Sequence, residues 1–200
     1  MEQRIPEWFA QRAGKVTASS VYKVMAKTKT GYSADRDNYQ AQLVVERMTG
    51  NPTKTYSNAA MEWGVEQEPN ARAAYEAQTG NLVEEVGFIP HPTIEMCGAS
   101  PDGVVGDGLI EIKCPETATM IEMQLNRKIP DKYLKQMQLQ MRCMDKKWCD
   151  FVCYDQRMPQ RLQLLIIRVE RDEKLIGEME AEIIKFLAEV DEKVKKLEAL

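Results

Sequence analysis

The chain has 200 residues, of which 44% are hydrophobic and 29% are charged, and its formal net charge is −4. This balance is typical of a globular protein with a sizeable buried core, and it excludes an intrinsically disordered chain. No apolar run is long enough to cross a bilayer and the N-terminus does not resemble a secretion signal, so we expect a cytoplasmic protein. The negative charge gives no global signal for nucleic-acid binding, although basic residues cluster within 23–29 and 127–147.

The first part of the sequence predicts helices. Ser and Thr residues precede apolar positions at helical spacing within 17–26, and a polar loop follows. A second helix is expected over 37–48, ending before Gly50. Residues 59–80 also have helical character, but Pro69 lies inside them and indicates either a kink or the start of a new helix.

The second part changes to short apolar runs separated by Gly, Pro and Asp. Residues 81–115 predict consecutive antiparallel strands, among which 109–113 is strongly apolar. A helix is expected over 131–144, and two further strands over 148–155 and 161–170.

The order of these elements predicts an α+β fold of the three-layer type, in which helices flank a mixed central β-sheet. Residues 1–200 are expected to form a single domain, with 172–200 as a C-terminal amphipathic helix. Apolar residues recur along this helix at spacings of three and four. That pattern suits packing on the domain itself and also suits contact with another subunit or a partner.

Histidine and cysteine chemistry is disfavoured. The single histidine, His91, lies between two prolines, so we discount a Ser–His or Cys–His nucleophile pair. The five cysteines are odd in number and lack paired spacing, which argues against a disulfide framework and a structural zinc site. Aspartate, glutamate and lysine remain as the groups that can carry chemistry.

These groups are concentrated in the segment "ASPDGVVGDGLIEIKCP" at 99–115. Asp102 lies in a Pro-Asp-Gly turn, and Glu111 and Lys113 share one face of a strand whose other face is apolar. A salt bridge is the usual explanation of Glu-x-Lys in a strand. However, the glycines after Asp102 permit a tight hairpin that returns Asp102 towards Glu111. Two such carboxylates and a main-chain carbonyl form an oxygen site suited to Mg²⁺ or Mn²⁺. Enzymes use these ions to hydrolyse phosphodiesters.

The motif resembles the Pro-Asp…Glu-x-Lys signature of PD-(D/E)xK nucleases. A wider set of segments resembles the phage lambda exonuclease, or YqaJ-type viral recombinase, family. These segments are, in chain order, "WFAQRAGKVTASSV", "WGVEQEPNAR", "CGASPDG", "LIEIKCP", "YLKQMQLQM", "YDQRM" and "VERDEK". They run from about Trp8 to Lys174, which is most of the chain. The resemblance implies a restriction-endonuclease-like core.

The resemblance also implies a metal site. Asp102, Glu111 and the carbonyl of Ile112 would bind one or two Mg²⁺ ions, with Mn²⁺ as the alternative. Lys113 would position or activate the attacking water. Glu68 matches a helix glutamate that reaches the metal. Because Pro69 disfavours helical geometry at Glu68, a surface charge on a helix is the alternative interpretation of that residue.

Further residues match the DNA contacts of the family. Those of its terminal 5′-phosphate pocket would be Arg12, Ser19, Ser100 and Gln136. An arginine can bind phosphate through two parallel hydrogen bonds, and Ser19 lies near a predicted helix start. Met61 would be an apolar wedge that separates the strands, and Lys29 a basic residue that tracks the groove. A core methionine and a surface lysine are the ordinary alternatives.

The family degrades one strand of linear double-stranded DNA from a 5′-phosphorylated end, releasing 5′-mononucleotides and leaving a 3′ single strand. It assembles as a homotrimeric ring around DNA and cooperates with a single-strand annealing recombinase in phage recombination. The resemblance therefore implies a Mg-dependent 5′→3′ exonuclease of a phage or prophage, acting in a bacterial cell. Two rivals remain: an endonuclease with the same metal site, and a DNA-end-binding or annealing module that keeps the fold without catalysis.

Overall fold

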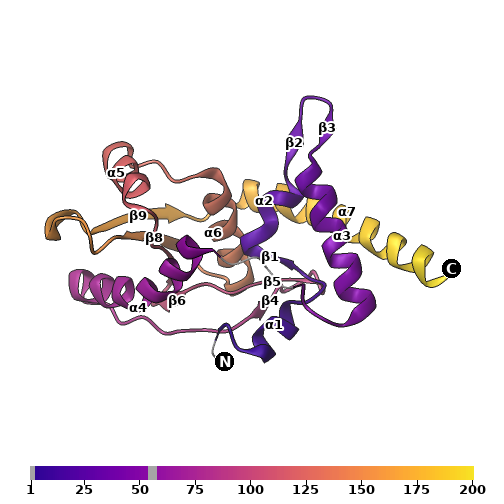
Figure 1. Cartoon of the computed structure of the whole chain (residues 1–200), viewed down its shortest axis with the longest axis horizontal. Coiled ribbons are helices and arrows are strands. Elements are labelled where there is room, and N and C mark those ends of the chain that lie inside the picture. The colour runs from indigo at the N-terminus through magenta and orange to yellow at the C-terminus, as the bar shows by residue number, and fades with distance from the viewer. Residues whose placement is uncertain (1–2, 54–57) are drawn as a thin grey trace.

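The structure is a computed structural model that describes residues 3–53 and 58–200 (Figure 1). Its N-terminal part is mainly helical. The helical elements of this part are α1 (Pro6–Arg12), the 3₁₀ helix η1 (Ala18–Ser20), α2 (Val21–Val24), α3 (Ala34–Thr49) and α4 (Ala59–Thr79). The short strands between them are β1 (Val16–Thr17), β2 (Lys27–Thr28) and β3 (Gly31–Tyr32).

The C-terminal part contains the longer strands and the longest helix. Its strands are β4 (Ile89–Pro90), β5 (Cys97–Ala99), β6 (Gly103–Val105), β7 (Gly108–Lys113), β8 (Trp148–Tyr154) and β9 (Leu164–Glu170). Its helices are α5 (Thr117–Asn126), α6 (Asp131–Met144), the 3₁₀ helix η2 (Gln160–Leu162) and α7 (Glu173–Glu198). The predicted α+β fold with a mixed sheet flanked by helices is confirmed.

A mixed four-stranded sheet, in the order β6-β7-β8-β9, forms the centre of the described structure. β7 and β8 are parallel, and the two outer pairs are antiparallel. Parallel neighbours require a crossover connection, and α5 and α6 provide it. On one face of β7, Leu109 packs with methionines of α5 and α6. On the other face, Ile110 and Ile112 pack with Ala71 and Tyr75 of α4.

The expectation of consecutive antiparallel strands over 81–115 is correct for β4 with β5 and for β6 with β7, but β5 does not pair with β6. β5 instead pairs with β1 in parallel and with β4 in antiparallel fashion, in a separate three-stranded sheet. The chain leaves this sheet through Pro101, which has no N–H to continue a ladder. The sequence pattern showed where the strands lie but could not show which ones pair.

The helix expected over 17–26 is shorter than predicted. Val16 and Thr17 pair in parallel with Cys97 and Gly98, so this end of the segment is a strand followed by η1 and the four-residue α2. The expected loop after it contains the β2–β3 hairpin. α1 and α5 were not expected, and α3 begins three residues before the predicted start at 37.

α4 is one continuous helix, so a new helix does not begin at Pro69. Asn58 caps its start by accepting a hydrogen bond from the backbone N–H of Met61 at 2.9 Å. Gly80 ends it with φ of 73°, in the left-handed region that glycine adopts readily. This helix places Glu68 and Tyr75, two turns apart, over the central sheet.

The C-terminal helix α7 packs on α3, α2 and α6 (Figure 1). The side chains that it buries there are Ile176, Met179, Ile183, Phe186, Leu187 and Val190. Of the two uses expected for its apolar face, contact with the rest of its own chain therefore accounts for the face as far as Val190. Among the described residues, we find no helix that combines the length and the apolar character needed to traverse a bilayer.

Candidate active site

The β6–β7 hairpin brings Asp102 to the strand that carries Glu111 and Lys113. Asp102 directly precedes β6, and Gly103 is the register partner of Ile110. The Oδ2 atom of Asp102 accepts a hydrogen bond from the backbone N–H of Ile112 at 2.7 Å. The hairpin therefore returns Asp102 towards Glu111, as the turn sequence predicted.

Glu111 is buried, with 1% of its surface exposed, and it is held by three donors. Lys113 forms an ion pair with Oε1. Gln136 donates to Oε1 at 2.6 Å, and Gln140 donates to Oε2 at 2.6 Å. The ion pair expected from the ordinary interpretation of Glu-x-Lys is present. However, a surface salt bridge would not need two buried amides, which offset the cost of burying the carboxylate.

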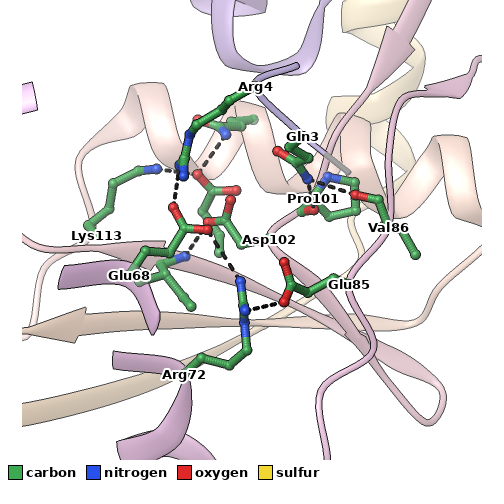
Figure 2. Close-up of polar contacts among 12 residues, drawn as sticks. Gln3, Arg4, Glu68, Arg72, Glu85, Val86, Pro101, Asp102 and Lys113 are labelled. Atoms are coloured by element: carbon green, nitrogen blue, oxygen red, sulfur yellow. Dashed lines mark hydrogen bonds and ion pairs between the residues drawn. The ribbon is translucent and has the colours of Figure 1, made fainter. Parts of the chain in front are cut away.

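Glu68 reaches the same region from α4. One carboxylate oxygen pairs with Arg4, and the other lies 3.4 Å from Nη2 of Arg72. Figure 2 shows Glu68 between these two arginines and beside Asp102, with Arg72 extending on to Glu85. Glu68 is helical despite the following Pro69, and its carboxylate faces the site, so it is more than a surface charge.

The electrostatics of the site are those of crowded carboxylates. Burial, followed by repulsion from Glu111 and Glu68, raises the pKa of Asp102 well above its usual range. Burial opposes the charged form of Lys113, but attraction to Glu111 and Asp102 outweighs it and raises the pKa of the ammonium group. The ammonium group of Lys113 therefore stays protonated, but its attraction does not offset the effect of burial and of the neighbouring carboxylates on Asp102.

A divalent cation fits this donor set chemically. The carboxylates of Asp102, Glu111 and Glu68 and the carbonyl of Ile112 are hard oxygen ligands of the kind that Mg²⁺ and Mn²⁺ prefer. A cation would also favour the charged form of Asp102, whose pKa is raised by burial and by the neighbouring carboxylates. Within residues 3–53 and 58–200, no three Asp, Glu, His or Cys side chains are arranged to hold an ion as they stand. The carboxylates are instead paired with Lys113, Arg4, Arg72 and backbone or amide donors.

These groups open into a cavity of about 570 Å³. Its lining includes Arg4, Ser19, Tyr22, Met61, Val65, Glu68, Asp102, Ile112, Lys113, Lys132, Tyr133 and Gln136. Its acidic groups come from the turn before β6 and from α4, and basic and aromatic side chains line it as well. A phosphate group with an attached nucleoside would find both kinds of partner in this space.

A second cluster adjoins the cavity and contains three of the four residues predicted to bind a terminal phosphate. Arg12 donates to the hydroxyl of Ser100 at 3.1 Å and to that of Ser19 at 3.3 Å. Its guanidinium lies 4.1 Å from the ring centroid of Trp8, which donates to Ser100 at 3.0 Å. Burial lowers the pKa of Arg12 to about 10. This value is still well above neutral pH, so the guanidinium keeps its charge there. Gln136 does not join this cluster, since it bonds Glu111, but it lines the same cavity as Ser19.

The two residues predicted to contact the DNA strands lie apart. Met61, in the first turn of α4, is 52% exposed and lines the cavity, which removes the core methionine as its alternative. Lys29 is exposed in the β2–β3 hairpin, which projects away from the sheet (Figure 1). The prediction that Lys29 tracks the DNA groove stays a prediction.

Three residues of the site were not predicted from the sequence. Gln140 follows Gln136 by four positions on the expected helix 131–144, so helical spacing would have found it. Arg72 follows Glu68 by four positions in the same way. Arg4 offered no local signal, because only the tertiary fold brings the N-terminal segment to α4.

A mixed sheet that presents an Asp, a Glu and a Lys from one hairpin is the arrangement of PD-(D/E)xK nuclease-like proteins. The chain belongs to the YqaJ-like viral recombinase family, because a profile of the YqaJ-like viral recombinase domain matches residues 7–147. This finding confirms the resemblance seen in the sequence.

Solved structures agree with the family. The chain is 52% identical to the alkaline exonuclease LHK-Exo of Laribacter hongkongensis, with a TM-score of 0.91. The match covers 98% of this chain and 97% of LHK-Exo. The same values hold for LHK-Exo in complex with dAMP. A phage-related exonuclease from Haemophilus somnus 129PT shares the fold, with 16% identity, a TM-score of 0.71 and coverage of 92% and 96%. A comparison with curated proteins returned no match.

Proposed function

We propose that this chain is a Mg²⁺-dependent exonuclease that degrades one strand of linear double-stranded DNA in the 5′→3′ direction. It starts at a 5′-phosphorylated end, releases 5′-mononucleotides and leaves a 3′ single strand. The observation that carries the proposal is the convergence of Asp102, Glu111, Lys113 and Glu68 on one cavity beside the Arg12 cluster. The similarity to the alkaline exonuclease LHK-Exo, at 52% identity, supports the nuclease class.

The residues divide the chemistry among them. Asp102, Glu111, Glu68 and the carbonyl of Ile112 would hold one or two Mg²⁺ or Mn²⁺ ions. Mg²⁺, when bound, would act as a Lewis acid on the phosphoryl oxygen and would make a bound water more acidic. Lys113 positions the attacking water and neutralises charge on the phosphate, while Gln136 and Gln140 keep the Glu111 carboxylate oriented.

End recognition belongs to the adjoining cluster. Arg12 binds the terminal phosphate through its guanidinium fork, and the hydroxyls of Ser19 and Ser100 add donors at 3.3 and 3.1 Å from that fork. Gln136 completes this pocket from the wall of the cavity. Met61 separates the terminal base pairs, and Lys29 follows the groove from the β2–β3 hairpin.

The proposed assembly and partners rest on the resemblance to the family. Three subunits form a ring around the duplex, and a single-strand annealing recombinase loads on the 3′ strand. A ring explains how a chain with a net charge of −4 retains DNA, because only the lining of the channel needs to be positive. The protein acts in the cytoplasm of a bacterial cell that carries the phage or prophage.

The test uses linear duplex DNA that is 5′-phosphorylated on one strand only and carries a different 3′ fluorophore on each strand. With Mg²⁺, the phosphorylated strand should shorten progressively while keeping its 3′ label. Lys113→Ala should abolish digestion. Lys147→Ala removes a lysine that is 77% exposed and should leave digestion unchanged. Arg12→Ala should lower the preference for the phosphorylated strand about tenfold, the effect of losing a charge-assisted hydrogen bond.

Other outcomes favour the rivals. Internal fragments, or linearisation of a closed circular duplex, would identify an endonuclease. Immediate release of the 3′ label as a mononucleotide would show that digestion runs in the 3′→5′ direction. Binding of DNA ends without cleavage, with either Mg²⁺ or Mn²⁺, would leave an end-binding module.

A further inference from the structure

The N-terminal segment is anchored across the edge of the active site. The side-chain amide of Gln3 donates to the carbonyl oxygens of Val86 and Pro101, each at 2.8 Å. Pro101 directly precedes Asp102, so this anchor joins the segment to the turn that carries a site carboxylate. Arg4 has φ of 66°, a left-handed conformation that is uncommon for arginine. The anchored segment holds Arg4 over the cavity, where it meets Glu68 (Figure 2).

The two arginines on Glu68 differ in their surroundings. Arg72 is 15% exposed, lies one helical turn from Glu68 and is also paired with Glu85. Arg4 is 43% exposed, lines the cavity and has Glu68 as its carboxylate partner in the described structure. Arg72 is therefore held by two carboxylates, those of Glu68 and Glu85. Arg4 is a cation that can exchange its partner for a group that enters the cavity.

The charges in the cavity favour such an exchange. A divalent cation held by Asp102 and Glu111 attracts Glu68 and repels a guanidinium at the same place, and both effects are strong in a partly buried site. An entering phosphate offers Arg4 a new anionic partner. The planar fork of arginine suits phosphate as well as carboxylate, so the exchange keeps the number of charge-assisted hydrogen bonds.

We infer that Arg4 is a DNA-phosphate-binding residue that pairs with Glu68 in the absence of DNA, and that phosphate replaces Glu68 as its partner when DNA enters the cavity. This inference rests on the proposed nuclease function. An exchange of partners at Arg4 can be distinguished from a purely structural ion pair by its effect on the affinities for metal and for DNA. Arg4 competes with a metal ion for Glu68 but helps to bind DNA, so its removal changes the two affinities in opposite directions.

The experiment measures both affinities in Arg4→Ala and Arg4→Lys. Lys195→Ala is the control for loss of one positive charge, because Lys195 lies in the last turn of α7, and Figure 1 shows the C-terminal end of α7 far from the central sheet. DNA binding is followed by the fluorescence anisotropy of a 5′-phosphorylated duplex with Ca²⁺, in samples whose DNA a gel shows to be intact. Metal binding is followed by calorimetric titration of the DNA-free protein with Mn²⁺.

Arg4→Ala should weaken DNA binding about tenfold and reduce the slope of log Kd against log salt by about 1, the change for one lost phosphate contact. The same variant should bind Mn²⁺ about threefold or more tightly, because the competitor for Glu68 is gone. Arg4→Lys should keep the salt slope and lose part of the affinity. Lys195→Ala should change neither quantity.

Unchanged DNA binding in Arg4→Ala, or weaker Mn²⁺ binding, would overturn the inference and leave Arg4 as a structural partner of Glu68. A circular dichroism spectrum like that of the wild type shows that each variant is folded. Neither affinity depends on cleavage. If the wild type binds DNA ends but digests nothing, the proposed function fails while the role of Arg4 is still decided.

Discussion

The helix that carries Glu68 is fastened to the sheet by a buried polar contact whose strength can be measured. The hydroxyl of Tyr75, on α4, donates to Oδ2 of Asp150 at 2.8 Å. Arg168 of β9 donates to both oxygens of Asp150, at 2.9 and 3.0 Å. Tyr75 and Asp150 are buried, whereas the side chain of Arg168 is 49% exposed.

Asp150→Ala removes all of these bonds at once. A hydrogen bond to a charged acceptor contributes about 1.5–3 kcal/mol, and the buried Tyr75 hydroxyl would lose its partner. The pair with the half-exposed Arg168 adds only about 0–1 kcal/mol, because water screens it and solvates the arginine afterwards. We therefore expect Asp150→Ala to lower the free energy of unfolding by about 2–4 kcal/mol. Tyr75→Phe, which removes only the hydroxyl, should lower it by about 1.5–3 kcal/mol.

Urea denaturation at neutral pH, followed by circular dichroism, measures these changes. Asp107→Ala removes an exposed aspartate paired with Lys147 and should stay within about 0.5 kcal/mol of the wild type. The double variant Tyr75→Phe/Asp150→Ala gives the coupling between the two groups. A loss below about 0.5 kcal/mol in Asp150→Ala, or no coupling, would refute the claim that this contact fastens α4.

Two further predictions concern buried groups. Gln140→Leu removes the hydrogen bond to Oε2 of Glu111, and it should lower stability by about 1–2 kcal/mol and raise the Mg²⁺ concentration needed for half-maximal nuclease activity; wild-type values of both would show that Gln140 does not orient Glu111. Burial raises the pKa of the Cys114, Cys143 and Cys153 thiols to about 12, so a thiol reagent at pH 8 should label the native protein far more slowly than the urea-unfolded chain. Because these pKa values lie above the ordinary value of 9.0, the unfolded chain loses these protons first, and the urea midpoint should fall as pH rises from 9 towards 12. Rapid labelling of the native protein, or a midpoint that stays constant over that range, would contradict the burial of these thiols.

Much of the local structure followed from the sequence. The apolar run before Lys113 indicated a buried strand, and β7 is central with both faces covered. The helices over 131–144 and beyond 172 were predicted close to their observed bounds, because apolar spacing and caps act over a few residues. Pairing between strands that are distant in the chain was not predictable in this way. The parallel contact of Val16 with Cys97 joins residues far apart in the chain, and it converted the start of an expected helix into β1.

The same division holds for the candidate site. The sequence by itself determined the hairpin that carries Asp102, Glu111 and Lys113, because turn residues and strand alternation are local properties. It also determined the family, through segments that span most of the chain. Only the tertiary structure decided that Gln136 bonds Glu111 while Arg12, Ser19 and Ser100 meet beside it. Only the tertiary structure brought Arg4 to Glu68, because a contact between groups on separate elements depends on how those elements pack and leaves no periodic signal in either segment.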